Sequence, residues 1–217
     1  VADCFTPAGT SVYEIPHLTG CFSYMSFEET LNWILTACLY EKATNDTEWI
    51  NTKIKTLRDC LSSIIARDKN NDGILDADSD RCAGGAEITT YDSLDISLGQ
   101  ARNNLYLGVK TWAAYVCLEA LFTRLGGTFI ADAEKAKEGA VRAAETISSK
   151  MIPGENYIPA VFEADNKSKI IPAVEGLIYP LFCGAPEAVK EKGPYAEFIK
   201  VLKIHLDTVL APGICLD

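Results

Sequence analysis

The fold is decided by residues 98–125, which read LGQARNNLYLGVKTWAAYVCLEALFTRL. Apolar residues recur along this stretch at helical spacing, at Leu98, Ala101, Leu105, Val109, Trp112, Val116 and Ala120. This period predicts one long amphipathic helix, which Gly126 and Gly127 end. Aromatic residues on such a helix are more often core than binding platforms, although Tyr106 is also a candidate to face a cavity.

Similar patterns lie on both sides of this helix. A capping box at residues 26–29 predicts a helix over about residues 27–43. Thr47 is the predicted cap of a second helix, which runs to about Arg67. A fourth begins at Asp132 and continues to residues 151–153, and a last one carries Phe198, Leu202, Leu206 and Val209. Short connections make neighbouring helices antiparallel hairpins.

The repeated hairpins predict an all-α fold with long irregular loops. Two architectures are built from such pairs, the α/α toroid and the helical solenoid. The sequence lacks the repeat of about 34 or 40 residues that marks the solenoid families, which favours part of an (α/α)6 toroid. Five or six helices are visible, about half the number that closes such a ring.

Composition excludes several classes of partner. The 217 residues hold 30 Asp and Glu against 20 Lys and Arg, a net charge of −10, which argues against nucleic acid. No apolar run approaches the roughly 20 residues that span a bilayer, so no membrane partner is expected. The 8 cysteines have no metal-ligand spacing, and we interpret them as reduced thiols of a cytoplasmic protein.

A loop of about thirty residues, from Asp68 to Ser97, is rich in carboxylates. Its start resembles a calcium loop, with candidate ligands at Asp68, Asn70, Asp72 and Asp76. Position twelve is Ser79, which cannot supply the bidentate carboxylate of an EF-hand. The alternative is a turn that Asp and Asn side chains nucleate without a metal. No cofactor is required, and calcium is the one candidate.

Residues 87–95, Glu-Ile-Thr-Thr-Tyr-Asp-Ser-Leu-Asp, place carboxylates among apolar side chains. Burial there would raise the pKa of a carboxyl group and suit it to donate a proton near neutral pH. The alternative is that Asp92, Ser93 or Asp95 caps the next helix. His17 and His205, the two histidines, are interpreted as structural residues.

Residues 71–81, 87–95, 98–106 and 112–115 together resemble glycoside hydrolase family 52, the β-xylosidases. The resemblance implies an (α/α)6 toroid preceded by a β-rich domain, an intracellular location, and a retaining mechanism on xylobiose and short xylo-oligosaccharides. It assigns the general acid/base to Asp92, with Asp95 as second choice, and makes Tyr91 and Asp95 candidate substrate-binding residues. The family's glutamate nucleophile precedes this loop, and neither Glu14, Glu28 nor Glu29 stands in a matching context.

We therefore interpret residues 1–217 as a partial (α/α)6 catalytic domain, a fragment of a longer enzyme. Its expected partners are a xylo-oligosaccharide and the remainder of the enzyme, which carries the nucleophile, with a homo-oligomer left open. Two alternatives stay open. One is a β-glucosidase of a related α/α-toroid family, and the other is a non-catalytic helical module that binds calcium or a protein.

Overall fold

The computed structural model describes residues 26–76, 103–163 and 165–215. Within these ranges the chain forms the α-helices α1 (Ser26–Thr44), α2 (Thr47–Arg67), α3 (Leu105–Leu125), α4 (Ile130–Ser149), α5 (Ile178–Phe182) and α6 (Ala196–Val209). Short 3-10 helices connect them: η4 (Gly127–Phe129), η5 (Pro172–Leu177) and η6 (Pro186–Val189). The described residues form no strand beyond one isolated bridge, between Asn104 and Val161. The prediction of a mostly helical protein is confirmed.

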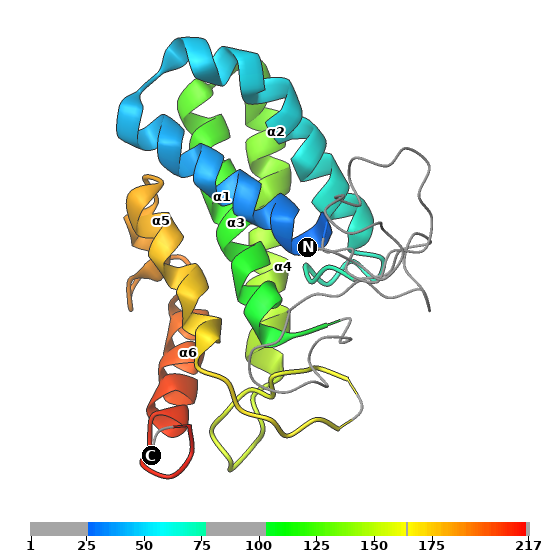
Figure 1. Ribbon diagram of the computed structural model, residues 1–217, viewed down its shortest axis with the longest axis vertical. Helices are drawn as coiled ribbons and strands as arrows, with labels where there is room; N and C mark the ends of the chain where they lie inside the picture. Colours follow the sequence, from blue (N-terminus) through cyan, green and yellow to red (C-terminus); the bar gives the residue numbers. More distant parts are fainter. Residues whose placement is uncertain (1–25, 77–102, 164, 216–217) are drawn as a thin grey trace, which may run out of the picture.

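α3 is the central helix of the described structure. It packs most extensively against α4, which runs beside it, and α1, η5 and α5 also contact it (Figure 1). By length and mean hydropathy α3 could cross a membrane, which corrects the expectation that no apolar run is so long. However, 83% of that apolar window is buried inside the protein. We therefore regard α3 as the core helix.

Three helices begin or are capped at other residues than the sequence predicts. α3 begins at Leu105, not Leu98, because Asn104 is extended and its side-chain oxygen accepts the backbone N–H of Leu107 at 2.9 Å. α2 is capped by Asp46 rather than Thr47, since the Asp46 carboxylate accepts the N–H of Trp49 at 2.9 Å. α4 begins at Ile130, two residues before the predicted Asp132, because η4 leads directly into it.

α6 packs against the core through aromatic side chains. The ring of Trp112 on α3 meets Tyr195 edge-on at a centroid distance of 5.4 Å and Phe198 at 4.9 Å. His205 is fully buried on the same helix, as the structural interpretation predicts. Its Nδ1 accepts the N–H of Ile158 and its Nε2 lies 2.8 Å from the carbonyl oxygen of Ile170. α6 is thereby bound to the chain segment between α4 and η5.

Candidate functional site

The candidate site is built around a buried lysine. Lys110 lies on the second turn of α3 and is 3% exposed. Its Nζ donates a hydrogen bond to the hydroxyl of Tyr106 at 2.7 Å. The same nitrogen lies 3.4 Å from Oε1 of Glu175 and 3.8 Å from Oε1 of Glu28. A buried ammonium is stable only with such partners, so the two carboxylates compensate its charge.

Two tyrosines complete what we call the Lys110 cluster: Glu28, Tyr106, Lys110, Glu175 and Tyr179. The hydroxyl of Tyr106 donates to Oε1 of Glu28 at 3.0 Å, and that of Tyr179 donates to Oε1 of Glu175 at 2.6 Å. These residues come from α1, α3, η5 and α5, and α3 contacts each of the other three elements. Four separate elements therefore supply a single polar group of side chains.

The two glutamates of the cluster differ in acidity. Burial raises the pKa of Glu28, and the hydrogen bond from Tyr106 and the charge of Lys110 offset this only in part. Burial acts on Glu175 in the same direction, but the hydrogen bond from Tyr179 and the ammonium of Lys110 outweigh it and lower the pKa. Glu175 is therefore an ionised acceptor at neutral pH, whereas Glu28 holds a proton more readily. Unequal carboxyl pairs of this kind are typical of functional sites.

The sequence interpretation missed most of this cluster. The sequence makes Tyr106 a candidate to face a cavity, and it does not place Glu28 in the context of the family's nucleophile. Lys110 carried a usable signal, because it is the one charged residue between Asn103 and Leu118 in an otherwise apolar stretch. Charged residues are almost never fully buried unless they are paired. A lone lysine in an apolar stretch therefore indicates a residue with partners of opposite charge. Glu175 and Tyr179 gave no signal, since only folding brings them to α3.

The carboxylate turn after α2 is described as far as Asp76. The Asp68 carboxylate accepts the N–H groups of Asp72 at 2.9 Å and Gly73 at 2.8 Å, and Asp76 accepts that of Lys69 at 2.8 Å. Gly73 has a φ of +81°, the left-handed conformation that the predicted sharp turn requires. Burial raises the pKa of Asp72, and the nearby charges of Asp68 and Asp76 add to the effect.

These contacts bear on the predicted calcium ligands Asp68, Asn70, Asp72 and Asp76. Asp68, Asp72 and Asp76 each accept a backbone N–H, and the bond from Ile74 to Asp72 is that of an Asx turn. Among the described residues, no group of three or more His, Cys, Asp or Glu is placed to hold a metal ion. Hydrogen bonds within the turn thus stabilise it, and calcium binding stays a prediction.

The other predicted site residues, Tyr91, Asp92 and Asp95, lie outside the described residues. Their roles as substrate contacts and general acid/base therefore stay predictions. In the sequence, the segment that carries them leads into α3, whose second residue is Tyr106.

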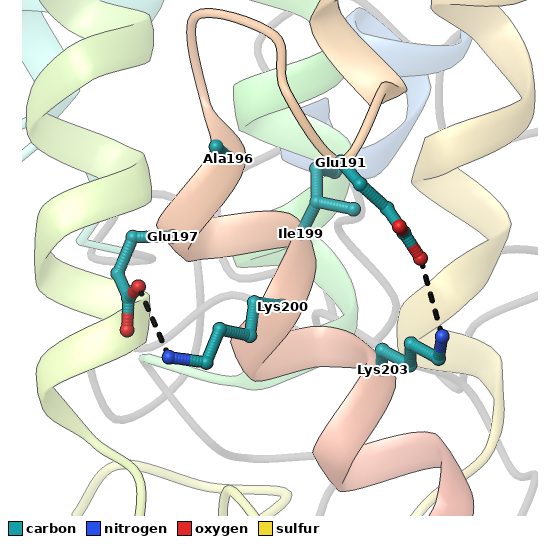
Figure 2. A pocket seen from close by; sticks show the side chains of 6 residues that line it. All are labelled: Glu191, Ala196, Glu197, Ile199, Lys200 and Lys203. Carbon is teal, nitrogen blue, oxygen red and sulfur yellow. Dashed lines mark hydrogen bonds and ion pairs between the residues drawn. The ribbon is translucent and has the colours of Figure 1, made fainter.

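A shallow hollow beside α6 is a weaker candidate. Glu191, Ala196, Glu197, Ile199, Lys200 and Lys203 line it (Figure 2). Lys200 pairs with Glu197 at 3.5 Å and Lys203 with Glu191 at 3.2 Å, and all four side chains are more than 60% exposed. Exposed ion pairs like these contribute little energy and orient no reacting group. We therefore place the candidate site at the Lys110 cluster.

Comparison with known proteins shows what the chain is similar to. The model of glycosyl hydrolase family 52 matches residues 1–40. A β-xylosidase of Geobacillus stearothermophilus is 46% identical over 220 aligned residues, which cover 100% of this chain and 31% of that protein. A second β-xylosidase of the same organism is 34% identical over 164 residues, 74% of this chain and 26% of the relative. The chain thus spans less than a third of the curated relatives it matches, and the resemblance to glycosyl hydrolase family 52 seen in its sequence is confirmed.

Proposed function

We propose that this chain is part of a retaining β-xylosidase that acts on xylobiose and short xylo-oligosaccharides. The observation that carries the proposal is the 46% identity to a β-xylosidase along the whole chain. The remainder of the enzyme would supply the nucleophile and complete an (α/α)6 toroid, of which residues 1–217 would be a part. The antiparallel α3–α4 hairpin and the α1–α2 pair that packs on it support this arrangement.

Within this proposal Asp92 is the general acid/base. In a retaining glycosidase two carboxyl groups stand about 5–5.5 Å apart, one as nucleophile and the other as proton donor. The donor protonates the departing glycosidic oxygen and then removes a proton from the water that releases the sugar. Tyr91 and Asp95 would contact the substrate beside it. The alignment with the β-xylosidase includes residues 87–95, which supports this assignment.

We also propose a cytoplasmic location. The five cysteines in the described residues, Cys38, Cys60, Cys117, Cys183 and Cys215, are free thiols. A reducing compartment maintains thiols in this state.

The substitution Asp92→Asn tests the proposed role in the full-length gene product. Glycosyl-enzyme formation from an aryl xyloside with a good leaving group should change little, because that group departs without a proton. Hydrolysis of xylobiose should fall by roughly 10²–10⁴-fold, because its alkoxide needs one. Covalent intermediate should accumulate, and azide should restore turnover by replacing water. Steady-state kinetics and mass spectrometry measure these effects.

The controls separate the alternatives. Asn caps a helix as well as Asp does, so if Asp92 is only a cap, xylobiose hydrolysis stays near the parent rate and Asp92 is not the acid/base. The same series with Asp95→Asn then shows whether the assignment is three residues off. Faster turnover of aryl glucoside than of aryl xyloside by the parent would favour the β-glucosidase alternative. Absence of both activities would favour a binding module.

A further inference from the structure

Three buried cysteines form a second cluster of reactive side chains. Cys38 lies on α1, Cys117 on α3, and Cys183 directly after α5, where these three helices contact one another. All three residues are fully buried free thiols. Cys117 and Cys183 share a side-chain hydrogen bond, and Cys38 lies close enough to interact electrostatically with both. Two sulfur atoms in such contact need only a short approach to form a disulfide.

Cationic side chains lie beside Cys183. Nη1 of Arg124 donates a hydrogen bond to the carbonyl oxygen of Cys183 at 3.0 Å. A Cβ atom added at Gly184 would lie 3.0 Å from the same nitrogen and 3.3 Å from Cε of Lys42. Positive charge of this kind favours the thiolate form of a cysteine.

The two hydrogen-bonded thiols therefore differ in acidity. The hydrogen bond from Cys117 lowers the pKa of Cys183, and the charge of Arg124 adds to this effect, while burial and Glu41 oppose it. Burial raises the pKa of Cys117, and the hydrogen bond to Cys183 raises it further. Cys183 is thus the thiol that more readily becomes a nucleophilic thiolate, and Cys117 is its protonated neighbour.

A surface hollow extends to the segment that holds Cys183. It has a volume of about 440 Å³, and Arg124, Gly184 and Ala185 are among the residues that line it. Phe182 and Gly184, the sequence neighbours of Cys183, are both exposed. Only a thin layer of protein therefore covers the thiol, and a small neutral oxidant reaches it after a small local movement.

We propose that Cys183 and Cys117 are a redox-sensing pair that a hydroperoxide converts into a disulfide. The Cys183 thiolate attacks one peroxide oxygen and the O–O bond breaks, which leaves a sulfenic acid on Cys183 and releases hydroxide. The hydroxide takes up the proton that Cys183 had lost. The Cys117 sulfur then attacks the Cys183 sulfur, the S–S bond forms, and a second water leaves with the Cys117 proton. The peroxide gains two electrons and the two thiols lose them, and a cellular dithiol reverses the oxidation.

The proposed bond would join the end of α5 to α3. The backbone N–H of Cys183 donates to the carbonyl oxygen of Tyr179 at 2.9 Å, and the hydroxyl of Tyr179 donates to Glu175. Oxidation would therefore act one helical turn from the Lys110 cluster. This inference is independent of the proposed sugar chemistry, because it uses only the thiols and their surroundings.

Limited oxidation of the full-length gene product by hydrogen peroxide tests the inference. The sample is quenched in acid, its remaining thiols are alkylated under denaturing conditions, and its peptides are mapped by mass spectrometry. A cross-linked pair of peptides that contains Cys117 and Cys183 should form before Cys60 is modified, and dithiothreitol should remove it. Cys60 is the internal comparison, because it is more exposed than the pair but burial raises its pKa.

Substitutions separate the two roles. Cys183→Ser should abolish the cross-link and leave Cys117 reduced, whereas Cys117→Ser should leave a sulfenic acid on Cys183 that dimedone traps. Cys60→Ser is the matched control, and the cross-link should form in it as in the parent. Circular dichroism shows whether each variant folds, and if a buried variant does not, the peptide map of the parent still decides.

Three results would overturn the inference. The first is modification of Cys60 before Cys183 in the parent, since exposure rather than thiolate character would then control oxidation. The second is a disulfide that joins Cys183 to Cys38 in place of Cys117. The third is a Cys183 that stays reduced in a molar excess of peroxide.

Discussion

Both ring nitrogens of His205 have hydrogen-bond partners in the backbone. Its Nδ1 accepts the Ile158 N–H at 3.1 Å, so the ring hydrogen lies on Nε2 and is donated to the carbonyl of Ile170. Burial lowers the pKa of His205 below 6.5, and the bond to Ile170 opposes this shift in part. A proton added to Nδ1 would face the Ile158 N–H and break that bond.

This arrangement predicts loss of stability in mild acid. As the pH falls below about 6.5, the unfolded chain binds a proton at His205 that the folded chain does not, so the free energy of unfolding decreases. One group contributes at most about 1.4 kcal/mol per pH unit. Urea unfolding from pH 7.5 to 5.5 should show this slope, and His205→Leu should remove the share due to His205. An unchanged slope in the variant would contradict the mechanism.

Single residues were the hardest part to predict from the sequence. The structural interpretation of His205 is confirmed, yet its partners, Ile158 and Ile170, are 47 and 35 residues away and no local pattern reveals them. Lys110 was detectable as a charge in an apolar stretch, but its acceptor Glu175 was not. Local patterns identify a residue that needs a partner, and only folding supplies the partner.

The elements themselves were largely predictable, because 3.6-residue periodicity is a property of contiguous sequence. α1 and α2 lie within a residue or two of their predicted bounds. The predicted start of α3 was wrong because Asn103 and Leu105 bond a distant segment: the Asn103 carbonyl accepts the N–H of Phe162, and the Leu105 N–H donates to the carbonyl of Ala160. Long-range pairing of the backbone overrides a local helical pattern there.

The closeness of α3 and α4 depends on Gly139. A Cβ atom at this position would lie 2.6 Å from Cζ of Tyr115, whose ring is fully buried. Alanine favours a helix over glycine by about 1 kcal/mol, but overpacking a core costs about 1–3 kcal/mol. Gly139→Ala should therefore lower the stability by up to about 2 kcal/mol in chemical unfolding. Lys135→Ala, on the exposed side of α4, is the control and should change it by less than about 0.5 kcal/mol.

A gain in stability from Gly139→Ala would show that Tyr115 can move aside.

The turn after α2 gives the second prediction at this scale. Asp68 accepts two backbone N–H groups, so Asp68→Ala should cost about 1–3 kcal/mol in the absence of any metal. Thermal unfolding with and without calcium tests the cation prediction separately. A calcium-dependent rise in melting temperature that Asp72→Ala abolishes would support a bound ion. Identical melting with and without calcium would leave only the interpretation of a turn without a metal.

The whole molecule presents apolar surface to solvent beside the α3 core. Three large side chains of α5 are the clearest case: Ile178, Leu181 and Phe182 are 50%, 49% and 60% exposed. Contiguous apolar patches on proteins usually mark contact surfaces. The chain covers 31% of a β-xylosidase that aligns with all of it, so we expect the remaining part of such an enzyme to cover this patch.

The chain prepared by itself should therefore associate. Light scattering with size-exclusion chromatography should show a mass that rises with concentration, because the α5 patch pairs with a second copy when its natural cover is missing. Replacing both Leu181 and Phe182 with Ser should shift the population toward monomer. Ile130→Ser is the matched control, since Ile130 is 42% exposed at the start of α4, and it should not change the mass. A monodisperse monomer that melts cooperatively would count against the fragment interpretation, because a part of a larger domain with an uncovered apolar face gains free energy by burying it.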